Sequence, residues 1–336
     1  MAYGIQNLAI TTPTLGTIRL GDVAVKNDQR IPVRSNHFKI TANFKDSDKC
    51  WVLHPIHASV AEATKQKPEA ITSIPVRMMF NEPTLNMRER YEAFDAGGRT
   101  VCAGNGKCAR RRVEGKVVAV DCPGSDNCSF GIDARCDLFA RLNVIIEGQD
   151  DELSSFILRT ESVNAVKALR AKLNRIYALM GKRLIGIPMT LKLRQKATSK
   201  SYWTRFWYAD LVLNQPALES VRLAKEYEAL LAEAGIDQSE FEKEAQAGLN
   251  NSAFEEGSDE FDDIESFLLA RGLGDEGDGG ATGETISIPP EGEIETSSTQ
   301  SEDQTQSGGL EGLRNFLEVA DEAGALTINL TESARK

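Results

Sequence analysis

Histidine, long apolar runs and enzyme motifs are what this chain of 336 residues has least of. It contains three histidines, and none lies between Cys102 and Cys136, where its cysteines gather. A hydrolase that depends on histidine therefore has few residues to use, and so has a catalytic zinc site, which commonly takes histidine ligands. No apolar run approaches the roughly 20 residues that a membrane helix needs. We therefore expect neither a histidine-based hydrolase nor a membrane partner.

Signals for export and for nucleotide chemistry are also missing. The first residues, Met1–Gln6, lack the basic start and apolar core of a signal peptide, so we expect a soluble, cytoplasmic protein. Gly106-Lys107 is followed by Cys108 rather than by Ser or Thr, and Val101 stands where a phosphate-binding loop has its first glycine. No Gly-x-Ser-x-Gly or His-Glu-x-x-His motif occurs. We expect a non-enzymatic protein and keep a metal-dependent hydrolase as a third hypothesis.

Charge is divided unevenly along the chain. The net charge of −11 combines +11 over residues 1–215 with −22 over residues 216–336. A basic body joined to an acidic tail suggests contact with nucleic acid, regulated by competition from the tail. The alternative is that the acidic tail only keeps the protein soluble.

Five of the six cysteines lie close together. They form the pattern Cys102-x5-Cys108-x13-Cys122-x5-Cys128-x7-Cys136, among the tight-turn residues of two glycine-containing loops. In an intracellular protein clustered cysteines are more often metal ligands than disulfides, and four thiolates with no histidine favour a closed, structural zinc site. We take Cys108 as the spare thiol and possible substitute, because Cys102 already occupies the glycine-rich turn. Buried free cysteines and a redox role are the alternatives.

Period-two and helical patterns alternate through residues 1–215. Strand-like runs at 16–22, 37–41 and 75–80 precede the cysteine segment, and two more at 141–146 and 155–160 follow it as a hairpin. A helix is expected from about Val163 to Met180, and a second hairpin from 189–193 to 203–208. These elements predict an α+β body, either an antiparallel sheet or a small barrel, with a zinc-binding insertion at 98–137.

The remainder of the chain has a different character. Residues 216–236 predict an amphipathic helix with Tyr227, Leu230 and Leu231 on its apolar side. From residue 237 to 336 the chain is acidic and rich in Gly, Ser and Thr, so we expect it to be mostly disordered. Short helical islands are expected near 261–270 and 309–323, either as partner-binding segments or as transient helices.

A cationic stretch with interleaved aromatic residues begins directly after the strand-like run at 155–160. No acidic residue occurs from Ser162 to Ala209. Proteins that bind single-stranded nucleic acid typically use cations to contact the phosphates and aromatic rings to stack on the bases. The alternative is that these rings are core residues and the cations form a solvated face. A basic triplet beside the cysteine segment also suits phosphate contact. The candidate nucleic-acid contacts are Arg110, Arg111, Arg112, Lys167, Arg170, Lys192, Arg194, Lys196, Lys200, Trp203 and Arg205.

Cys50, His54 and His57 form a second possible ligand or catalytic set. Pro55 between the two histidines argues against the regular helix that would aim both at one metal ion. Ordinary packing and surface roles are the alternative that we favour.

Taken in order, these segments resemble a known family. The series consists of Gly16–Gly21, Cys102–Gly106 with Ala109–Arg111, Asp121–Gly124 with Cys128, Cys136 with Ala140–Val144, Phe156–Thr160 and Gly186–Leu191. It is similar to the phage recombination directionality factors that work with large serine integrases, and to relatives in integrative elements labelled "hydrolase or metal-binding protein". The resemblance covers about residues 16–213 and leaves out the acidic tail.

The resemblance implies a metal set and a function. It assigns the metal to Cys102, Cys122, Cys128 and Cys136, with zinc as the cofactor. It implies an accessory protein of DNA recombination that binds a serine integrase on DNA and biases it from integration toward excision without cutting DNA. The extra thiol and the long acidic tail depart from the phage members. A second hypothesis is therefore a single-stranded DNA-binding protein of a mobile element, whose acidic tail recruits partners and competes with DNA.

Overall fold

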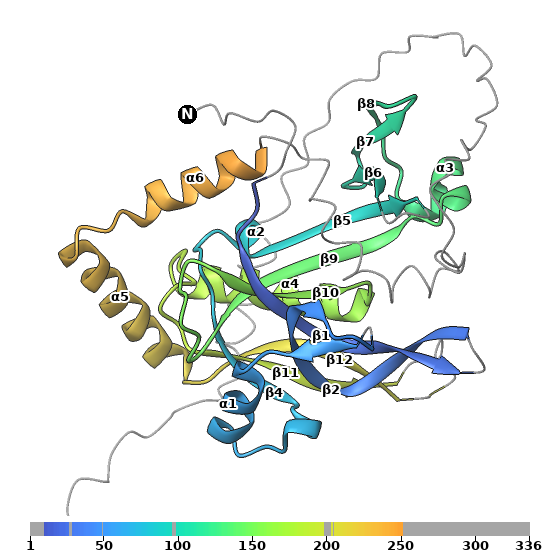
Figure 1. Ribbon diagram of the computed structural model, residues 1–336. Coiled ribbons are helices and arrows are strands. Elements are labelled where there is room, and N and C mark those ends of the chain that lie inside the picture. Colours follow the sequence, from blue (N-terminus) through green and yellow to red (C-terminus); the bar gives the residue numbers. More distant parts are fainter. Residues whose placement is uncertain are drawn as a thin grey trace, which may run out of the picture. The chain divides into compact units, whose positions relative to one another are not determined.

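Most of the basic body is described by a computed structural model (Figure 1). The described residues are 10–26, 29–48, 50–95, 99–197, 203 and 205–250. All of them fall within residues 1–279, one of the two units into which the chain divides. The expected tail from residue 251 onward, with both helical islands, lies outside the described residues, as does Lys200.

Strands dominate this part of the chain. They are β1 (Thr14–Lys26), β2 (Gln29–Lys45), β3 (Trp51–Leu53), β4 (Ser73–Arg77), β5 (Met87–Phe94), β6 (Thr100–Gly104), β7 (Cys108–Val113), β8 (Lys116–Asp121), β9 (Asp137–Ile146), β10 (Ser155–Thr160), β11 (Met189–Lys196) and β12 (Phe206–Leu213). The helices are α1 (Ile56–Ala63), α2 (Pro83–Asn86), α3 (Ser129–Asp133), α4 (Val163–Leu179), α5 (Ala217–Glu233) and α6 (Gln238–Asn250), with 3-10 turns at Pro68–Ala70 and Ser125–Asn127.

The strands form one large, mostly antiparallel sheet. Its order is β3-β2-β1-β10-β9-β5-β6-β7-β8, in which β1 and β10 run parallel and the other neighbours antiparallel. The expected α+β class with an antiparallel sheet is confirmed. The expected hairpins at β9–β10 and β11–β12 are also present, although the second strand of the latter runs from Phe206 to Leu213 rather than from 203 to 208.

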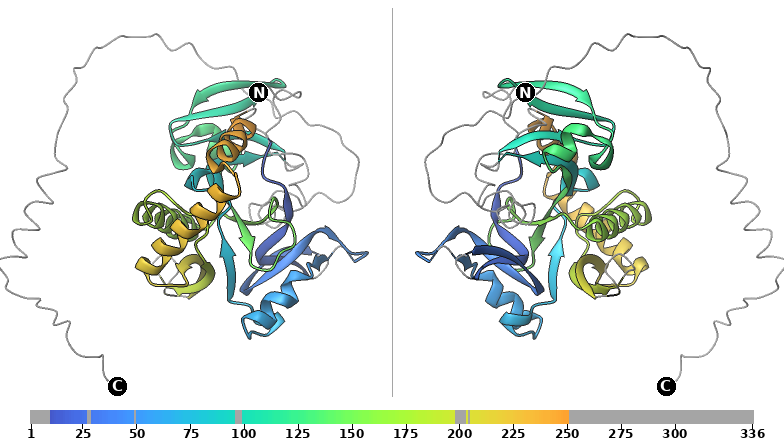
Figure 2. Two further views of the ribbon diagram at one scale, coloured as in Figure 1. Left: turned by 90° about the vertical axis from the view of Figure 1, so that its left-hand side faces the viewer. Right: turned by 90° about the vertical axis from the view of Figure 1, so that its right-hand side faces the viewer.

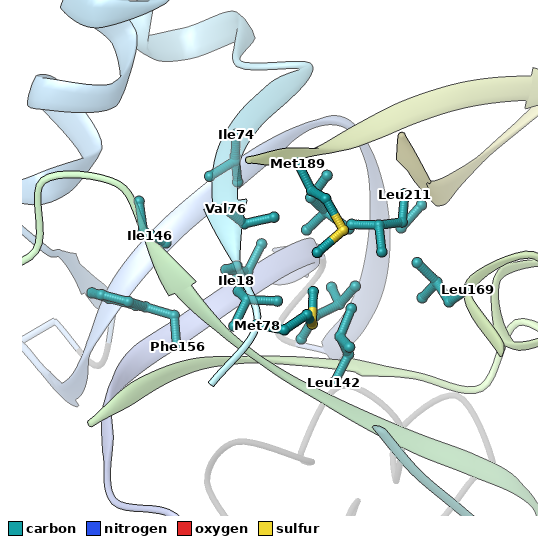
Figure 3. Packing of buried hydrophobic residues seen from close by; sticks show 14 of the residues in the cluster. Ile18, Ile74, Val76, Met78, Leu142, Ile146, Phe156, Leu169, Met189 and Leu211 are labelled. Carbon is teal, nitrogen blue, oxygen red and sulfur yellow. The ribbon is translucent and has the colours of Figure 1, made fainter. Parts of the chain in front are cut away.

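Strand β9 is the point where the sheet branches. Its first residues pair with β5, while Ile145 and Ile146 at its end pair with β4, which continues to β11 and β12. Two arms of the sheet therefore enclose one hydrophobic core (Figure 3). Alternation along β9 sends Ala140, Leu142, Val144 and Ile146 into that core and Phe139, Arg141, Asn143 and Ile145 to the opposite face.

Helix α4 closes the core on the side of β12. Its buried residues Val166, Leu169, Leu173 and Ile176 recur at helical spacing, as the sequence predicts. Ser162 caps its start by accepting a hydrogen bond from the Ala165 amide at 3.4 Å. Gly181, with φ +65°, takes the left-handed conformation that follows its end.

Helices α5 and α6 differ in detail from the expected pattern. The predicted helix at 216–236 is present as α5, but it buries Ser220 and Ala224, and Leu230 remains 61% exposed. Residues 238–250, which composition assigns to the acidic tail, form α6. The Phe241 ring stacks on Phe80 with centroids 5.3 Å apart, because a short apolar stripe of α6 meets an apolar hollow beside β9.

Strands β6–β8 and α3 stand at one end of the described body, and α1 lies at the other (Figures 1 and 2). The cysteine segment is therefore a local extension of the sheet beyond β5. None of the helices in the described ranges is long and apolar enough to cross a membrane.

Candidate functional site

Four of the five clustered cysteines surround one small cavity. Cys102 lies in β6, Cys122 follows β8, Cys128 precedes α3 and Cys136 precedes β9. The cavity is thus built from four separate elements of the insertion. Cys108 is not part of it: this residue is exposed at the start of β7, and its Sγ lies 3.7 Å from Asn105 Oδ1.

Two glycines allow the thiols to approach one another. A Cβ on Gly104 would lie 2.6 Å from Cys122 Sγ, and one on Gly131 would lie 3.1 Å and 3.2 Å from the Cβ atoms of Cys128 and Cys136. Neither position has room for a side chain without movement of a cysteine. The glycines in this segment therefore serve the packing of the thiols as well as turn formation.

Arg111 is directed toward the cysteines. Its Nη2 lies 3.6 Å from Cys128 Sγ, and its Cζ lies 4.0 Å from the centre of the Phe130 ring. Burial raises the pKa of the Cys102 thiol, and the neighbouring Arg111 guanidinium acts in the opposite direction. Arg111, which the sequence suggested as a phosphate contact, is placed to offset negative charge on sulfur.

The cysteines are gathered without forming a complete ligand set. Across residues 10–250, apart from the short undescribed gaps, no group of three or more His, Cys, Asp or Glu side chains is positioned to hold a metal ion. All six cysteines lie within the described residues, and none of them is part of a disulfide bond. The arrangement brings four sulfurs and one guanidinium to one cavity, and the expected zinc is not tested by it.

The two histidines of the Cys50, His54 and His57 set make packing contacts and hydrogen bonds within the protein. His57 is buried, its Nδ1 accepts a hydrogen bond from the Ile40 amide at 3.2 Å, and its Nε2 lies 2.9 Å from the Pro68 carbonyl oxygen. The His54 ring meets Phe156 edge-on at 5.0 Å. Burial lowers the pKa of both histidines. These contacts favour the packing interpretation.

Some predicted nucleic-acid contacts lie at the end of the β11–β12 hairpin where the connection between the two strands begins and ends. Lys196 pairs in register with Phe206, the residue after Arg205, and its Nζ donates to Asn164 Oδ1 at 3.0 Å in the first turn of α4. Lys167 lies one turn further along that helix and is exposed. Trp203, in the connection between the two strands, is 74% exposed. We name Lys167, Lys196, Trp203 and Arg205 the hairpin-end patch.

Other predicted contacts are engaged within the protein. Arg170 forms an ion pair with Glu89 and donates to the Met87 carbonyl at 2.6 Å. Arg194 Nε lies 2.6 Å from an Asp210 carboxylate oxygen. These two side chains have structural roles in this fold. The remaining members on the hairpin and on β7 are Lys192 and Arg110, both exposed, and Arg112, which is partly buried.

Strand register brings together cations that sequence reasoning treated separately. Lys39 of β2 pairs with Arg19 of β1, and Arg141 of β9 pairs with both Arg159 of β10 and Arg88 of β5. Arg19 and Arg159 follow Ile18 and Leu158, which are paired in the parallel strands. The five residues therefore stand side by side across five strands, on the face opposite the hydrophobic core. We name them the cationic row.

The row is partly buried and has defined contacts. Arg141 is 1% exposed and donates to both carboxylate oxygens of Glu92 at 3.0 Å. Arg159, 9% exposed, donates to Thr17 Oγ1 at 3.2 Å. The Arg19 Cζ lies 3.7 Å from the centre of the Trp51 ring.

Strand patterns alone do not reveal the row. Each member lies at an outward position of a period-two run, which on its own indicates only a polar face. The row becomes visible only when the register of β1, β2, β5, β9 and β10 is known, because its members come from residues 19 to 159 of the chain and are brought together by strand pairing.

Comparison with protein families places the chain in a family. A family model described as Gp3-like, recombination directionality factor-like, matches residues 15–214. That range begins in β1, ends directly after β12, and includes the thiol cavity, the cationic row and the hairpin-end patch. Comparisons with curated proteins and with solved structures gave no match.

Proposed function

Because the chain belongs to the Gp3-like, recombination directionality factor-like family, we propose that it is a non-enzymatic accessory protein that biases a site-specific recombinase toward excision. The match covers the sheet from the second residue of β1 to the end of β12, together with the thiol cavity, the cationic row and the hairpin-end patch, and this observation carries the proposal. The proposed partners are DNA and a large serine integrase of a phage or integrative element. The proposed place of action is the cytoplasm.

Contact with DNA is proposed at the hairpin-end patch. Lys196 pairs with Phe206, which Arg205 directly precedes, and Lys167 presents a third cation from α4. Exposed cations near one another displace counterions from the phosphate backbone, so each contributes to affinity and to its salt dependence. The patch contains no carboxylate, in contrast to Arg194, which is paired with Asp210.

Zinc is proposed as a structural ion held by Cys102, Cys122, Cys128 and Cys136. The chemistry of the four donors fits, because four thiolates make a closed tetrahedral zinc site once their sulfurs converge. A Cβ at Gly104 or Gly131 would crowd the cysteines, so these glycines let the thiols approach one another, and Arg111 would compensate the negative charge of a thiolate cluster. When bound, the zinc ion would cross-link the β6–β8 extension to the start of β9, and the four cysteines would hold the ion in place.

Elemental analysis tests the zinc proposal. Protein purified without chelator is expected to contain about one zinc per chain, which Cys128→Ser removes and Cys108→Ser retains. Because Cys108 lies outside the cavity, its variant is the matched control. Zinc-free wild-type protein would contradict the proposal.

A recombination assay tests the function. The full chain is added to the large serine integrase encoded in the same element, with either integration or excision substrates. We expect excision to require the chain and integration to be inhibited by it. The double variant Lys196→Ala, Arg205→Ala is expected to reduce the excision effect, while Arg222→Ala in α5, an exposed arginine paired with Glu219 and Glu226, retains it. No effect of the chain on either reaction would refute the proposal.

A second function, single-stranded DNA binding, is favoured by one observation. Trp203 is 74% exposed and lies two residues before Arg205 in the connection between β11 and β12, and an exposed ring is what a stacking platform requires. Under this alternative Trp203→Ala should weaken binding of a single-stranded oligonucleotide by about 1–3 kcal/mol and leave duplex binding unchanged. Equal loss on both substrates would instead favour a backbone contact.

A further inference from the structure

Strand β11 presents cations on the face of the sheet that points away from the hydrophobic core. It lies between β4 and β12 (Figure 1). Leu191 and Leu193 are buried in the core, whereas Lys192, Arg194 and Lys196, which alternate with them, are exposed. The outer face of this arm of the sheet is therefore polar and basic.

Strand β12 adds aromatic rings to the same face. Residues opposite one another in antiparallel strands share a face, and Tyr208 is opposite Arg194 while Phe206 is opposite Lys196. Both rings are partly exposed. Trp207, between them, packs against the hydrophobic core on the other side of the strand. The register thus separates one core ring from two rings that lie among the cations.

Positive charge is in excess on this outer face. Asp210 is the acidic residue among the outward positions of β11 and β12, and it is buried with its carboxylate 2.6 Å from Arg194 Nε. Lys192 forms no ion pair within the described residues. The Lys196 Nζ donates to the neutral side chain of Asn164. A polyanion is the partner whose charge complements such a face.

The spacing of the side chains suits a single strand of nucleic acid. Phe206 and Tyr208 are two residues apart in a strand, or about 6.8 Å, which is about twice the 3.4 Å between stacked bases of one DNA strand. An extended strand with unstacked bases can therefore place one base on each ring. The cations of β11 have the same spacing and lie about 4.8 Å to the side, where the phosphates of that strand would run.

The two kinds of side chain together select this ligand over other polyanions. A duplex keeps the faces of its bases stacked inside the helix, so it offers phosphates to Lys192 but no flat ring to Tyr208. An acidic peptide offers carboxylates but no series of flat rings. Rings beside cations are the combination with which proteins bind single strands.

We propose that the outer face of β11 and β12 is a binding site for single-stranded DNA, in which Phe206 and Tyr208 stack on bases and Lys192 and Lys196 contact phosphates. We name these four residues the β11–β12 platform. The inference rests on the second proposed function, single-stranded DNA binding. It assigns the main contact of that function to the strands themselves, and Trp203 in their connection extends the site.

Fluorescence anisotropy of the full chain with a labelled single-stranded oligothymidylate, and with a duplex of the same length, tests the rings. Phe206→Leu and Tyr208→Leu keep an apolar side chain but remove the flat ring. Each should weaken single-strand binding by about 5- to 150-fold and leave duplex binding unchanged. Phe44→Leu is the matched control, because Phe44 is an exposed ring on β2 and its loss should change neither affinity.

The salt dependence of the same binding tests the cations. Lys192→Gln removes one phosphate contact, so the slope of log affinity against log salt for the single strand should decrease by about 0.7. Lys116→Gln, at an exposed lysine of β8, is the control and should keep the wild-type slope. Because Lys192 is exposed, this measurement remains valid even if a ring variant folds poorly.

Three outcomes would overturn the platform. If the wild-type chain binds the single strand and both ring variants bind it equally well, the site lies elsewhere and single-strand binding itself survives. An equal loss on single strand and duplex would show that the rings do not stack on bases. No single-strand binding by the wild-type chain would remove both the platform and the second proposed function. All three are measured without a recombinase, so they are distinct from failure of the excision assay.

Discussion

Arg141 and Glu92 form the most deeply buried ion pair among the described residues. Their exposed fractions are 1% and 0%, and the two Arg141–Glu92 contacts measure 3.0 Å. Arg90 reaches the same carboxylate at 2.6 Å, so Glu92 joins two arginines of neighbouring strands. A buried pair of this kind contributes little relative to an apolar pair, but breaking it leaves a charge without compensation.

We therefore predict unequal effects from single and double replacements at this pair. Arg141→Met removes the buried one of the two arginines that contact Glu92 and should lower the free energy of unfolding by about 3 kcal/mol, since Arg90 still contacts the carboxylate. The double variant Arg141→Met, Glu92→Leu should lose less, because neither member of the buried pair remains and Arg90, which is partly exposed, can be solvated. Urea unfolding measures both. Additive losses from the two single variants would show that the pair is not coupled.

At the scale of elements, α6 shows how an acidic segment becomes ordered. Its formal composition resembles the tail, yet Phe241, Ala245 and Leu249 form a stripe that packs on Phe80 and Met79. Asn81 adds a polar contact, since its backbone amide donates a hydrogen bond to Glu242 Oε1 at 2.6 Å. A few apolar residues at helical spacing are enough to stabilise a helix when the body offers an apolar hollow for them to pack into.

The contribution of α6 can be measured through Phe241. Replacing this partly exposed ring by Ala should cost about 1–2 kcal/mol and speed amide exchange throughout α6. Leu230→Ala on α5 is the control, because Leu230 is 61% exposed and its loss should stay within about 0.5 kcal/mol. Unchanged exchange in the Phe241 variant would mean that α6 does not depend on this contact.

The sequence predicted individual helices and strands better than it predicted which strands pair with one another. The β9–β10 hairpin and α4 follow from local periodicity, as do the core positions Leu169 and Leu173. The choice of Cys108 as the spare thiol agrees with its place outside the cavity, although metal binding itself stays a prediction. Local patterns did not show the parallel β1–β10 pairing, because residues 14–18 meet residues 155–158 only through the fold. The cationic row depends on that pairing and was missed for the same reason.

For the whole molecule, the few histidines make stability depend on pH. Burial lowers the pKa of His37, His54 and His57 below the ordinary value of 6.5. The unfolded chain therefore binds more protons than the folded chain once the pH falls below about 6.5. Stability contributed by these groups is present above that pH and is lost as the pH decreases toward the lowered values in the folded state.

We predict that the urea midpoint of the full chain decreases between pH 7.5 and pH 5.5, with His57 as a main source. Its Nδ1 must stay unprotonated to accept the hydrogen bond from the Ile40 amide, so protonation removes a buried contact. His57→Gln should lower stability at pH 7.5 but reduce the change between the two pH values. His37→Gln, at a partly exposed ring, is the comparison and should alter the pH dependence less. If His57→Gln leaves the full pH dependence in place, His57 is not its cause, and His37, His54 or carboxylates of the body are responsible.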